Sequence, residues 1–208
     1  MTHRTLLALG GSLRSGSLTT AALRVAAQHA RELGAHSELL TVDELGLPLL
    51  APDATPAQHP AAQRLLDTAA RADVVLVGTP IYGGTPSGAV KNVLDTMHLG
   101  KSGNTGPLAA KRVGVLSVGG GSLTGRFEFQ RGATAFLDIA CRNLGAWVDP
   151  RHVELSELAF DVDGELVDAL ARAELSDLVD RLIGSASPPL DPAADPTQEA
   201  PLTAAVTS

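Results

Sequence analysis

The chain has 208 residues, of which 44% are hydrophobic and 19% charged, and this balance indicates one globular α/β domain with one core. The formal net charge of −7, without a basic stripe along the chain, argues against nucleic acid as a partner. No apolar run approaches the ~20 residues of a membrane span, so we expect no membrane partner. No secretion-signal pattern precedes the first strand pattern, which predicts a cytoplasmic protein.

Strand and helix patterns alternate along the chain. The expected strands cover residues 5–9, 36–42, 73–78, 112–118 and 146–153. The expected helices cover residues 18–33, 61–71, 87–98, 129–144 and 165–183. A long, proline-punctuated loop at 43–60 separates the second strand from the second helix. The third strand is apolar at nearly every position, as expected for a strand covered by helices on both faces.

Five such units predict a doubly wound α/β fold, a flavodoxin-like five-stranded parallel sheet with the order 2-1-3-4-5. In that order the first and third strands are neighbours, and ligands bind outside the carboxyl ends of such strands. We expect one flavodoxin-like, flavin-binding domain over residues 1–183. Residues 184–208 are rich in Pro, Ala, Ser and Thr without apolar periodicity, which predicts a disordered C-terminal tail.

The turn after the first strand is rich in glycine and hydroxyl groups and leads directly into a helix. Glycine allows close backbone approach, hydroxyls donate hydrogen bonds, and a helix start presents free N–H groups to an anion. Ser17 stands where an NTPase loop needs Lys, and the dinucleotide glycine pattern is missing. A terminal phosphomonoester, such as that of FMN, fits what remains. The alternative is a plain strand-to-helix turn capped by Ser17. The candidate phosphate-binding residues are Ser12, Arg14, Ser17, Leu18 and Thr19.

Two further loops should lie at the same edge of the sheet. The loop after the third strand can present a flat ring and backbone amides, both of which suit an isoalloxazine ring. Its alternative interpretation is a hairpin-like Gly-Gly turn. The glycine run after the fourth strand indicates either close approach to a ligand or flexibility. The candidate flavin-binding residues in these loops are Pro80, Ile81, Tyr82, Gly83, Gly84, Ser87, Gly119, Gly120 and Gly121.

The sequence offers no catalytic or metal-binding constellation of side chains. Cys141 falls on the apolar stripe of the helix expected at 129–144, which predicts a core position. The six His residues are scattered without metal-ligand spacing. Ser12 and Ser17 lack a paired His and Asp, so we treat them as phosphate donors. We therefore assign no catalytic residue and no metal site.

With these loops in place, the chain resembles the NADPH-dependent FMN reductase family, a flavodoxin-like group of flavin, quinone and azo-dye reductases. The first loop is similar to the family's Gly-Ser-x-Arg-x-x-Ser-x-Asn turn, with Thr19 where Asn is common. The second loop resembles the family's Thr-Pro-x-Tyr segment followed by Gly-x-x-Lys-Asn. The matching residues are Gly11, Ser12, Arg14, Ser17, Thr79, Pro80, Tyr82, Gly88, Lys91 and Asn92. Ile81 and Gly83 beside Tyr82 look more like the branch that supplies reduced FMN to two-component monooxygenases.

The resemblance implies hydride transfer from C4 of NADPH or NADH to N5 of FMN, for which no protein acid or base is obligatory. It also implies a homodimer or homotetramer, and a flavin-dependent monooxygenase as recipient of the reduced flavin. Three alternatives stay open. The first is a quinone or azo-dye reductase with tightly bound FMN, and the second is a non-enzymatic flavodoxin-type electron carrier. The third is a nucleotide-phosphate binding protein without redox function.

Overall fold

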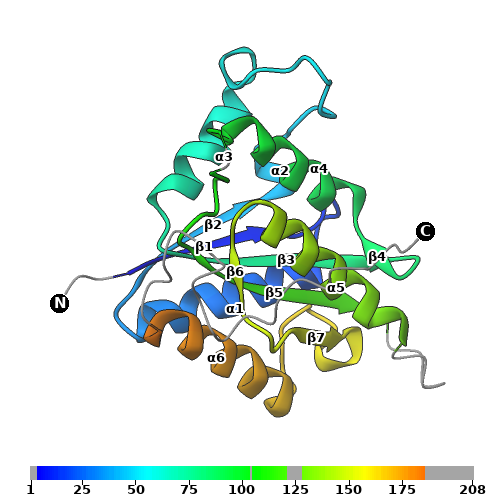
Figure 1. Ribbon diagram of the computed structural model, residues 1–208. Helices are drawn as coiled ribbons and strands as arrows, with labels where there is room; N and C mark the ends of the chain where they lie inside the picture. Colours follow the sequence, from blue (N-terminus) through cyan, green and yellow to red (C-terminus); the bar gives the residue numbers. More distant parts are fainter. Residues whose placement is uncertain (1–3, 104, 121–127, 186–208) are drawn as a thin grey trace, which may run out of the picture.

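The computed structural model describes residues 4–103, 105–120 and 128–185 (Figure 1). The disordered tail expected from residue 184 onward lies outside the described residues from 186, and Gly121 of the third loop also lies outside them. Within the described ranges, no helix is both long and apolar enough to cross a membrane.

A parallel sheet forms the centre of the molecule. Its strands are β1 (Thr5–Gly10), β2 (His36–Thr41), β3 (Val74–Tyr82), β5 (Arg112–Gly119), β6 (Trp147–Val148) and β7 (Val153–Ser156). The order is β2-β1-β3-β5, with β6 and β7 both paired to β5 on its outer side. The short strand β4 (Thr85–Pro86) is antiparallel to the end of β3. The predicted flavodoxin-like order is therefore confirmed.

The fifth position of the sheet differs from the prediction in one respect. Instead of one strand over 146–153, β6 and β7 pair with separate stretches of β5. Pro150 lies between them and has no N–H to donate to a sheet ladder, which explains the break. The pairing resumes at Val153, opposite Leu116.

Helices cover both faces of the sheet (Figure 1). One face packs against α1 (Leu18–Glu32) and α6 (Ala169–Gly184). The other packs against α3 (Pro60–Arg71), α4 (Gly88–Met97), α5 (Glu128–Asn143) and the short α2 (Val42–Leu45). Single-turn 3₁₀ helices occur at Pro56–Gln58, His98–Gly100 and Glu157–Ala159.

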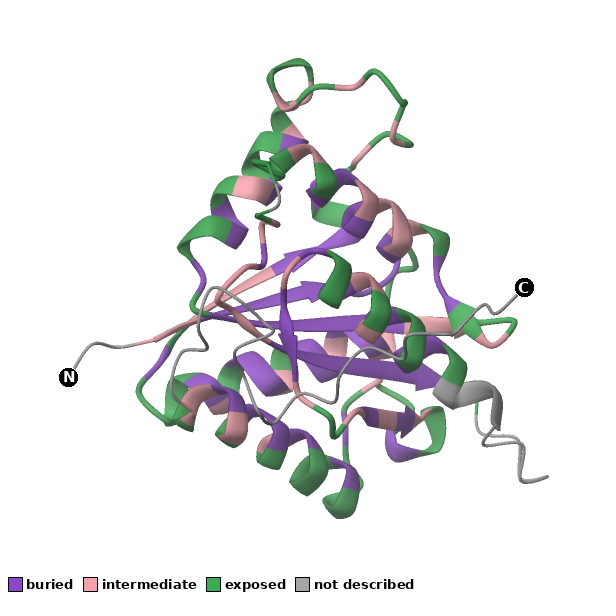
Figure 2. Ribbon diagram, viewed as in Figure 1, coloured by how far each residue is buried: buried purple, intermediate pink, exposed green. Residues whose placement is uncertain are grey.

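The two faces of the sheet explain the continuous apolar runs of its central strands. In β1, Leu6 and Ala8 belong to the core beneath α1 and α6, whereas Leu7 and Leu9 belong to the core beneath α3, α4 and α5. All four side chains are fully buried. Figure 2 shows the central strands buried over most of their length. Burial on both faces is what a near-continuous apolar strand requires.

Two element boundaries differ from their predictions for local reasons. β3 continues to Tyr82 instead of ending at residue 78, because residues 79–80 still pair with β5 and residues 81–82 pair with β4. α6 begins at Ala169 instead of at residue 165, because Asp168 caps it by accepting the N–H of Ala171 at 2.9 Å. The loop expected at 43–60 contains α2 and a 3₁₀ turn.

Cys141 of α5 confirms its predicted core position. It is fully buried, and burial raises the pKa of its thiol to about 12, with the negative charge of Asp138 adding to the shift. We expect a thiol-specific disulfide reagent at about pH 8 to label Cys141 of the native protein only as fast as the protein unfolds. In urea, where the thiol is exposed, labelling should be rapid. Release of the reagent's chromophore measures both rates. Stoichiometric labelling of the native protein within seconds would contradict this burial.

Candidate active site

The loop between β1 and α1 ends in a capped helix start. Ser17 is the N-cap of α1, and its Oγ accepts the N–H of Thr20 at 3.2 Å. The N–H groups of Leu18 and Thr19, in the first turn, have no acceptor within the helix because no preceding turn exists. The hydroxyl hydrogen of Ser17 remains a donor, since the cap uses only a lone pair of its oxygen. The plain capping role and an anion-binding role are therefore compatible at Ser17.

Two glycines, the last residue of β1 and the first of the loop, allow backbone segments to approach closely. Gly10 has a φ of +128°, and a Cβ placed on it would lie 1.9 Å from the carbonyl oxygen of Gly78 in β3. The N–H of Gly11 donates to that same oxygen at 3.0 Å. A Cβ on Gly11 would lie 2.5 Å from Oγ1 of Thr20 in α1. These glycines thus serve the joint between β1, β3 and α1, whereas the sequence alone suggests only approach to a ligand.

The remaining predicted residues of the loop differ in exposure. Arg14 is exposed, and no described residue forms an ion pair with its guanidinium group. Ser12 is 8% exposed, and its Oγ accepts the backbone N–H of Arg14 at 3.1 Å. Ser17 and Leu18 are half-buried. Thr19 is only 1% exposed, so it offers a ligand the least surface of the five predicted residues.

The segment after the buried part of β3 is a tight hairpin. Gly83 and Gly84 both have positive φ, +59° and +83°, which is the backbone of a type I′ turn. Tyr82 pairs with Thr85 across the turn, and Thr85 Oγ1 donates to the carbonyl oxygen of Tyr82 at 2.9 Å. The backbone therefore adopts the hairpin that was the alternative interpretation. It presents the ring of Tyr82, 56% exposed, at the edge of the sheet.

Ser87 anchors the hairpin from within. It is 3% exposed and is the N-cap of α4, where its Oγ accepts the N–H of Val90 at 3.3 Å. Its own N–H donates to Oγ1 of Thr79 at 3.0 Å. Sequence reasoning did not single out Thr79 as a site residue, although it begins the Thr-Pro-x-Tyr motif. Its hydroxyl ties the start of α4 to the end of β3.

The three loops contact one another at the carboxyl edge of the sheet. The hydroxyl groups of Ser12 and Tyr82 lie 3.3 Å apart, which joins the first loop to the hairpin. A Cβ on Gly119 would lie 2.7 Å from Cδ1 of Ile81, so the end of β5 packs closely behind the hairpin. Gly120 is exposed, and its nearest side chain is Glu157. Pro80 and Ile81 are half-buried between these contacts.

The other residues of the second motif hold the scaffold. Lys91 Nζ donates to both carboxylate oxygens of Asp95 at 2.5 Å, the ion pair that residues four positions apart can form on a helix. The side-chain amide of Asn92 accepts the N–H of Leu50 at 2.9 Å and donates to the carbonyl oxygen of Pro48 at 2.8 Å. Asn92 therefore holds the long loop after α2 against α4.

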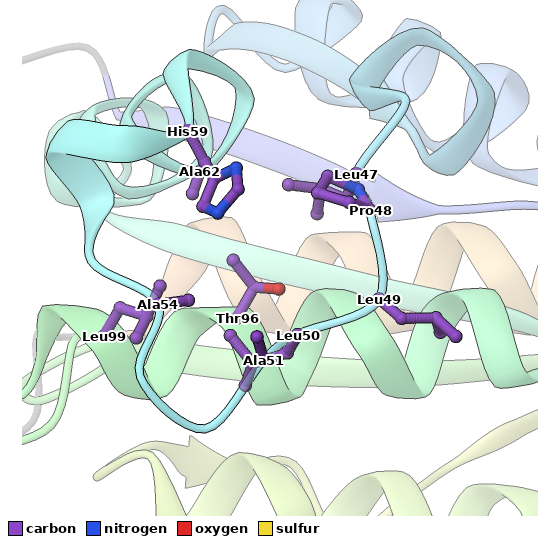
Figure 3. Close-up of a pocket in the computed structure, with 10 residues that line it drawn as sticks. All are labelled: Leu47, Pro48, Leu49, Leu50, Ala51, Ala54, His59, Ala62, Thr96 and Leu99. Atoms are coloured by element: carbon purple, nitrogen blue, oxygen red, sulfur yellow. The ribbon is translucent and has the colours of Figure 1, made fainter.

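That long loop encloses a hollow against α3 and α4. Its lining consists of Leu47, Pro48, Leu49, Leu50, Ala51, Ala54, His59, Ala62, Thr96 and Leu99. Figure 3 shows Leu47 and Pro48 on one side and His59 and Ala62 on the other. The hydroxyl of Thr96 already donates to the carbonyl oxygen of Asn92 at 2.7 Å. This hollow has no glycine loop and no Lys or Arg in its lining, so a phosphate group fits the edge of the sheet better.

The sequence profile described as NADPH-dependent FMN reductase matches residues 4–159. The chain belongs to the NADPH-dependent FMN reductase family. An NAD(P)H-dependent FMN reductase of Pseudomonas aeruginosa is 30% identical over 170 residues, 80% of this chain and 86% of that protein. An NADPH:quinone oxidoreductase of Arabidopsis thaliana is 29% identical over 180 residues, 83% of this chain and 86% of that protein. The protein is an oxidoreductase, and its family implies FMN and a nicotinamide nucleotide as ligands.

A solved structure confirms the fold. FerB of Paracoccus denitrificans, a flavoenzyme NAD(P)H:(acceptor) oxidoreductase, superposes with a TM-score of 0.66 at 22% sequence identity. The alignment covers 87% of this chain and 96% of that chain. The resemblance noted from the loop motifs is therefore confirmed at the level of the family and of the fold. Among the residues that the structure describes, no group of three or more His, Cys, Asp or Glu could hold a metal ion.

Substitution of Gly119 tests the packing of β5 behind the hairpin. We expect Gly119→Ala to push Ile81 toward the site, to lower the free energy of unfolding by about 1–3 kcal/mol, and to weaken FMN binding. Urea denaturation and quenching of FMN fluorescence measure the two effects. Gly88→Ala is the matched control, because a Cβ there meets no atom within 4 Å. Unchanged FMN affinity in Gly119→Ala would mean that Ile81 and Gly119 do not contribute to flavin binding.

Proposed function

We propose that this protein reduces FMN with a hydride from NADPH or NADH at the carboxyl edge of the sheet. The observation that carries the proposal is the contact between Ser12 and Tyr82, 3.3 Å between hydroxyl oxygens. It joins a loop suited to a phosphate group with a hairpin suited to a flat ring. A phosphorylated flavin needs both features side by side, and the family to which the chain belongs names such a ligand.

In this proposal the first loop holds the phosphate of FMN. Ser12 and Ser17 donate from their hydroxyl groups, and the exposed guanidinium of Arg14 adds a positive charge that no described carboxylate neutralises. The first turn of α1, at Leu18 and Thr19, contributes the positive end of the helix dipole. Each of these groups favours the phosphate dianion of FMN over the neutral hydroxyl group that riboflavin carries at the same position.

In the same proposal, the hairpin and the glycines at the end of β5 would hold the flavin ring. Pro80, Ile81 and Tyr82 supply apolar and aromatic surface, and the turn at Gly83 and Gly84 supplies backbone N–H groups. Gly119 and Gly120 carry no side chain that would compete with the ring for space. Bound FMN supplies the redox chemistry, by accepting a hydride. The chain's own residues hold the ring in place for the nicotinamide and exclude water from the contact.

The reduced flavin could pass its electrons on in two ways. In the first, FMN is a substrate that leaves the site and serves a partner monooxygenase. In the second, FMN stays bound and passes electrons to a quinone or azo dye; the Arabidopsis relative, which carries the name of a quinone reductase, favours this form. Retention of flavin through purification distinguishes the two.

The proposal also covers the catalytic domain, the oligomeric state and the cellular compartment. We place the catalytic domain at residues 1–183 and treat residues 184–208 as a tail without a role in the reaction. A homodimer or homotetramer in the cytoplasm is the form we propose for the active enzyme. Size-exclusion chromatography with light scattering measures its mass in solution.

An anaerobic stopped-flow experiment tests the proposed reaction. The purified protein, with and without added FMN, is mixed with NADPH or NADH while the flavin absorbance is followed. We expect rapid bleaching that requires the protein. Dependence on added FMN indicates a substrate, and bleaching without added FMN indicates a retained cofactor. If the flavin neither binds nor bleaches with either nucleotide, the proposed function is wrong.

Two arginines provide a matched comparison in the same experiment. Arg14→Ala should raise the FMN concentration for half-maximal bleaching by about 3- to 10-fold, because an exposed charge–phosphate contact contributes roughly 1 kcal/mol. Arg24→Ala removes an exposed arginine from the outer face of α1 and should leave that concentration unchanged. Equal effects of both substitutions would mean that only the overall charge matters.

A further inference from the structure

The hydroxyl oxygen of Ser12 has two polar neighbours. The backbone N–H of Arg14 donates to Ser12 Oγ at 3.1 Å, and the hydroxyl of Tyr82 lies 3.3 Å from the same atom. A serine hydroxyl has two lone pairs and one hydrogen. If Tyr82 donates, both lone pairs are used, and the hydrogen of Ser12 must be given to a third group.

The chemistry of the two hydroxyl groups favours Tyr82 as the donor. A phenol is far more acidic than an aliphatic alcohol, so it is the better donor, and the alcohol is the better acceptor. Ser12 also has little choice of rotamer, because the N–H two residues ahead already fixes its oxygen in a local turn. With Tyr82 as the donor, the hydrogen of Ser12 points away from both neighbours.

The hydroxyl of Tyr82 is delivered by a rigid element. Tyr82 is the last residue of β3, which continues without a break from the core. Its backbone is paired with Thr85 and closed by the type I′ turn at Gly83 and Gly84. Tyr82 contributes both an exposed ring and a fixed hydroxyl to the edge of the sheet. The two parts of this side chain can have different roles.

We propose that Tyr82 is a positioning residue that makes the site specific for phosphorylated flavin. Its hydroxyl holds Ser12 as an oriented donor for the phosphate group, so that the site distinguishes FMN from riboflavin. The inference rests on the proposed function, since it concerns the flavin of that same site. In this proposal the ring of Tyr82 faces the flavin ring, and its hydroxyl acts on the phosphate through Ser12.

The substitution Tyr82→Phe tests the proposal because it removes the hydroxyl and keeps the ring. Dissociation constants for FMN and riboflavin are measured by quenching of flavin fluorescence, without nicotinamide nucleotide. We expect the FMN affinity to fall about 3- to 10-fold, the effect of one hydrogen bond, while the riboflavin affinity changes less than about twofold. The ratio of the two constants is the readout, since a change in the hairpin alone would affect both flavins.

Two results of this measurement would overturn the proposal. Equal loss for FMN and riboflavin would mean that Tyr82 acts through the ring or the hairpin. Tighter FMN binding by Tyr82→Phe would mean that Ser12 donates to Tyr82, so that the contact competes with the phosphate. If the unmodified protein binds neither flavin, the proposed function itself fails, and that result is visible before any variant is compared.

Two further variants separate the hydroxyl contact from structural effects. In a Ser12→Ala background, Tyr82→Phe should cause no additional change in the FMN-to-riboflavin ratio, because the group that it orients is gone. Thr85→Val is the control, since it removes the hairpin hydroxyl that donates to the carbonyl oxygen of Tyr82. We expect it to leave the ratio unchanged. Additive effects of Ser12→Ala and Tyr82→Phe on the ratio would contradict the proposal.

Discussion

The site depends on how closely the end of β1 approaches β3. At Gly10 there is no space for a side chain, because a Cβ would lie 1.9 Å from the carbonyl oxygen of Gly78. That same oxygen accepts the N–H of Gly11, so the first loop leaves the sheet while still bonded to the neighbouring strand. This joint brings the start of α1 beside the hairpin at the end of β3. A larger residue at Gly10 would separate the two halves of the proposed flavin site.

From this joint outward, short contacts between hydroxyl groups and glycines connect the loops. Ser12 reaches Tyr82, and Ile81 rests on Gly119. The apolar cores beneath them hold the strands in register, so each loop begins from a fixed point. The protein thereby places the loop proposed to bind phosphate and the hairpin proposed to hold the ring on one rigid edge. The chemistry itself belongs to the flavin and the nicotinamide.

The sequence predicted the parts of this arrangement that depend on local patterns. The alternation of strand and helix patterns along the chain predicted the strand order. Glycine and hydroxyl residues indicated where the three loops follow their strands. It did not predict the break at Pro150, where one residue without an N–H divides the fifth strand. Nor did it predict the continuation of β3 to Tyr82, or its contact with Ser12, because residues 70 positions apart meet only through the sheet. The hydrogen bonds of Asn92 to Pro48 and Leu50 were not predicted either, because that loop lies more than 40 positions away in the sequence.

A crystal structure of the protein with FMN tests the central claim most directly. The account predicts density for the phosphate within hydrogen-bond distance of the hydroxyl groups of Ser12 and Ser17, at the first turn of α1. It predicts the flavin ring against Tyr82 and the turn at Gly83 and Gly84. Density for FMN in the hollow beside His59, with none at the first loop, would contradict the account.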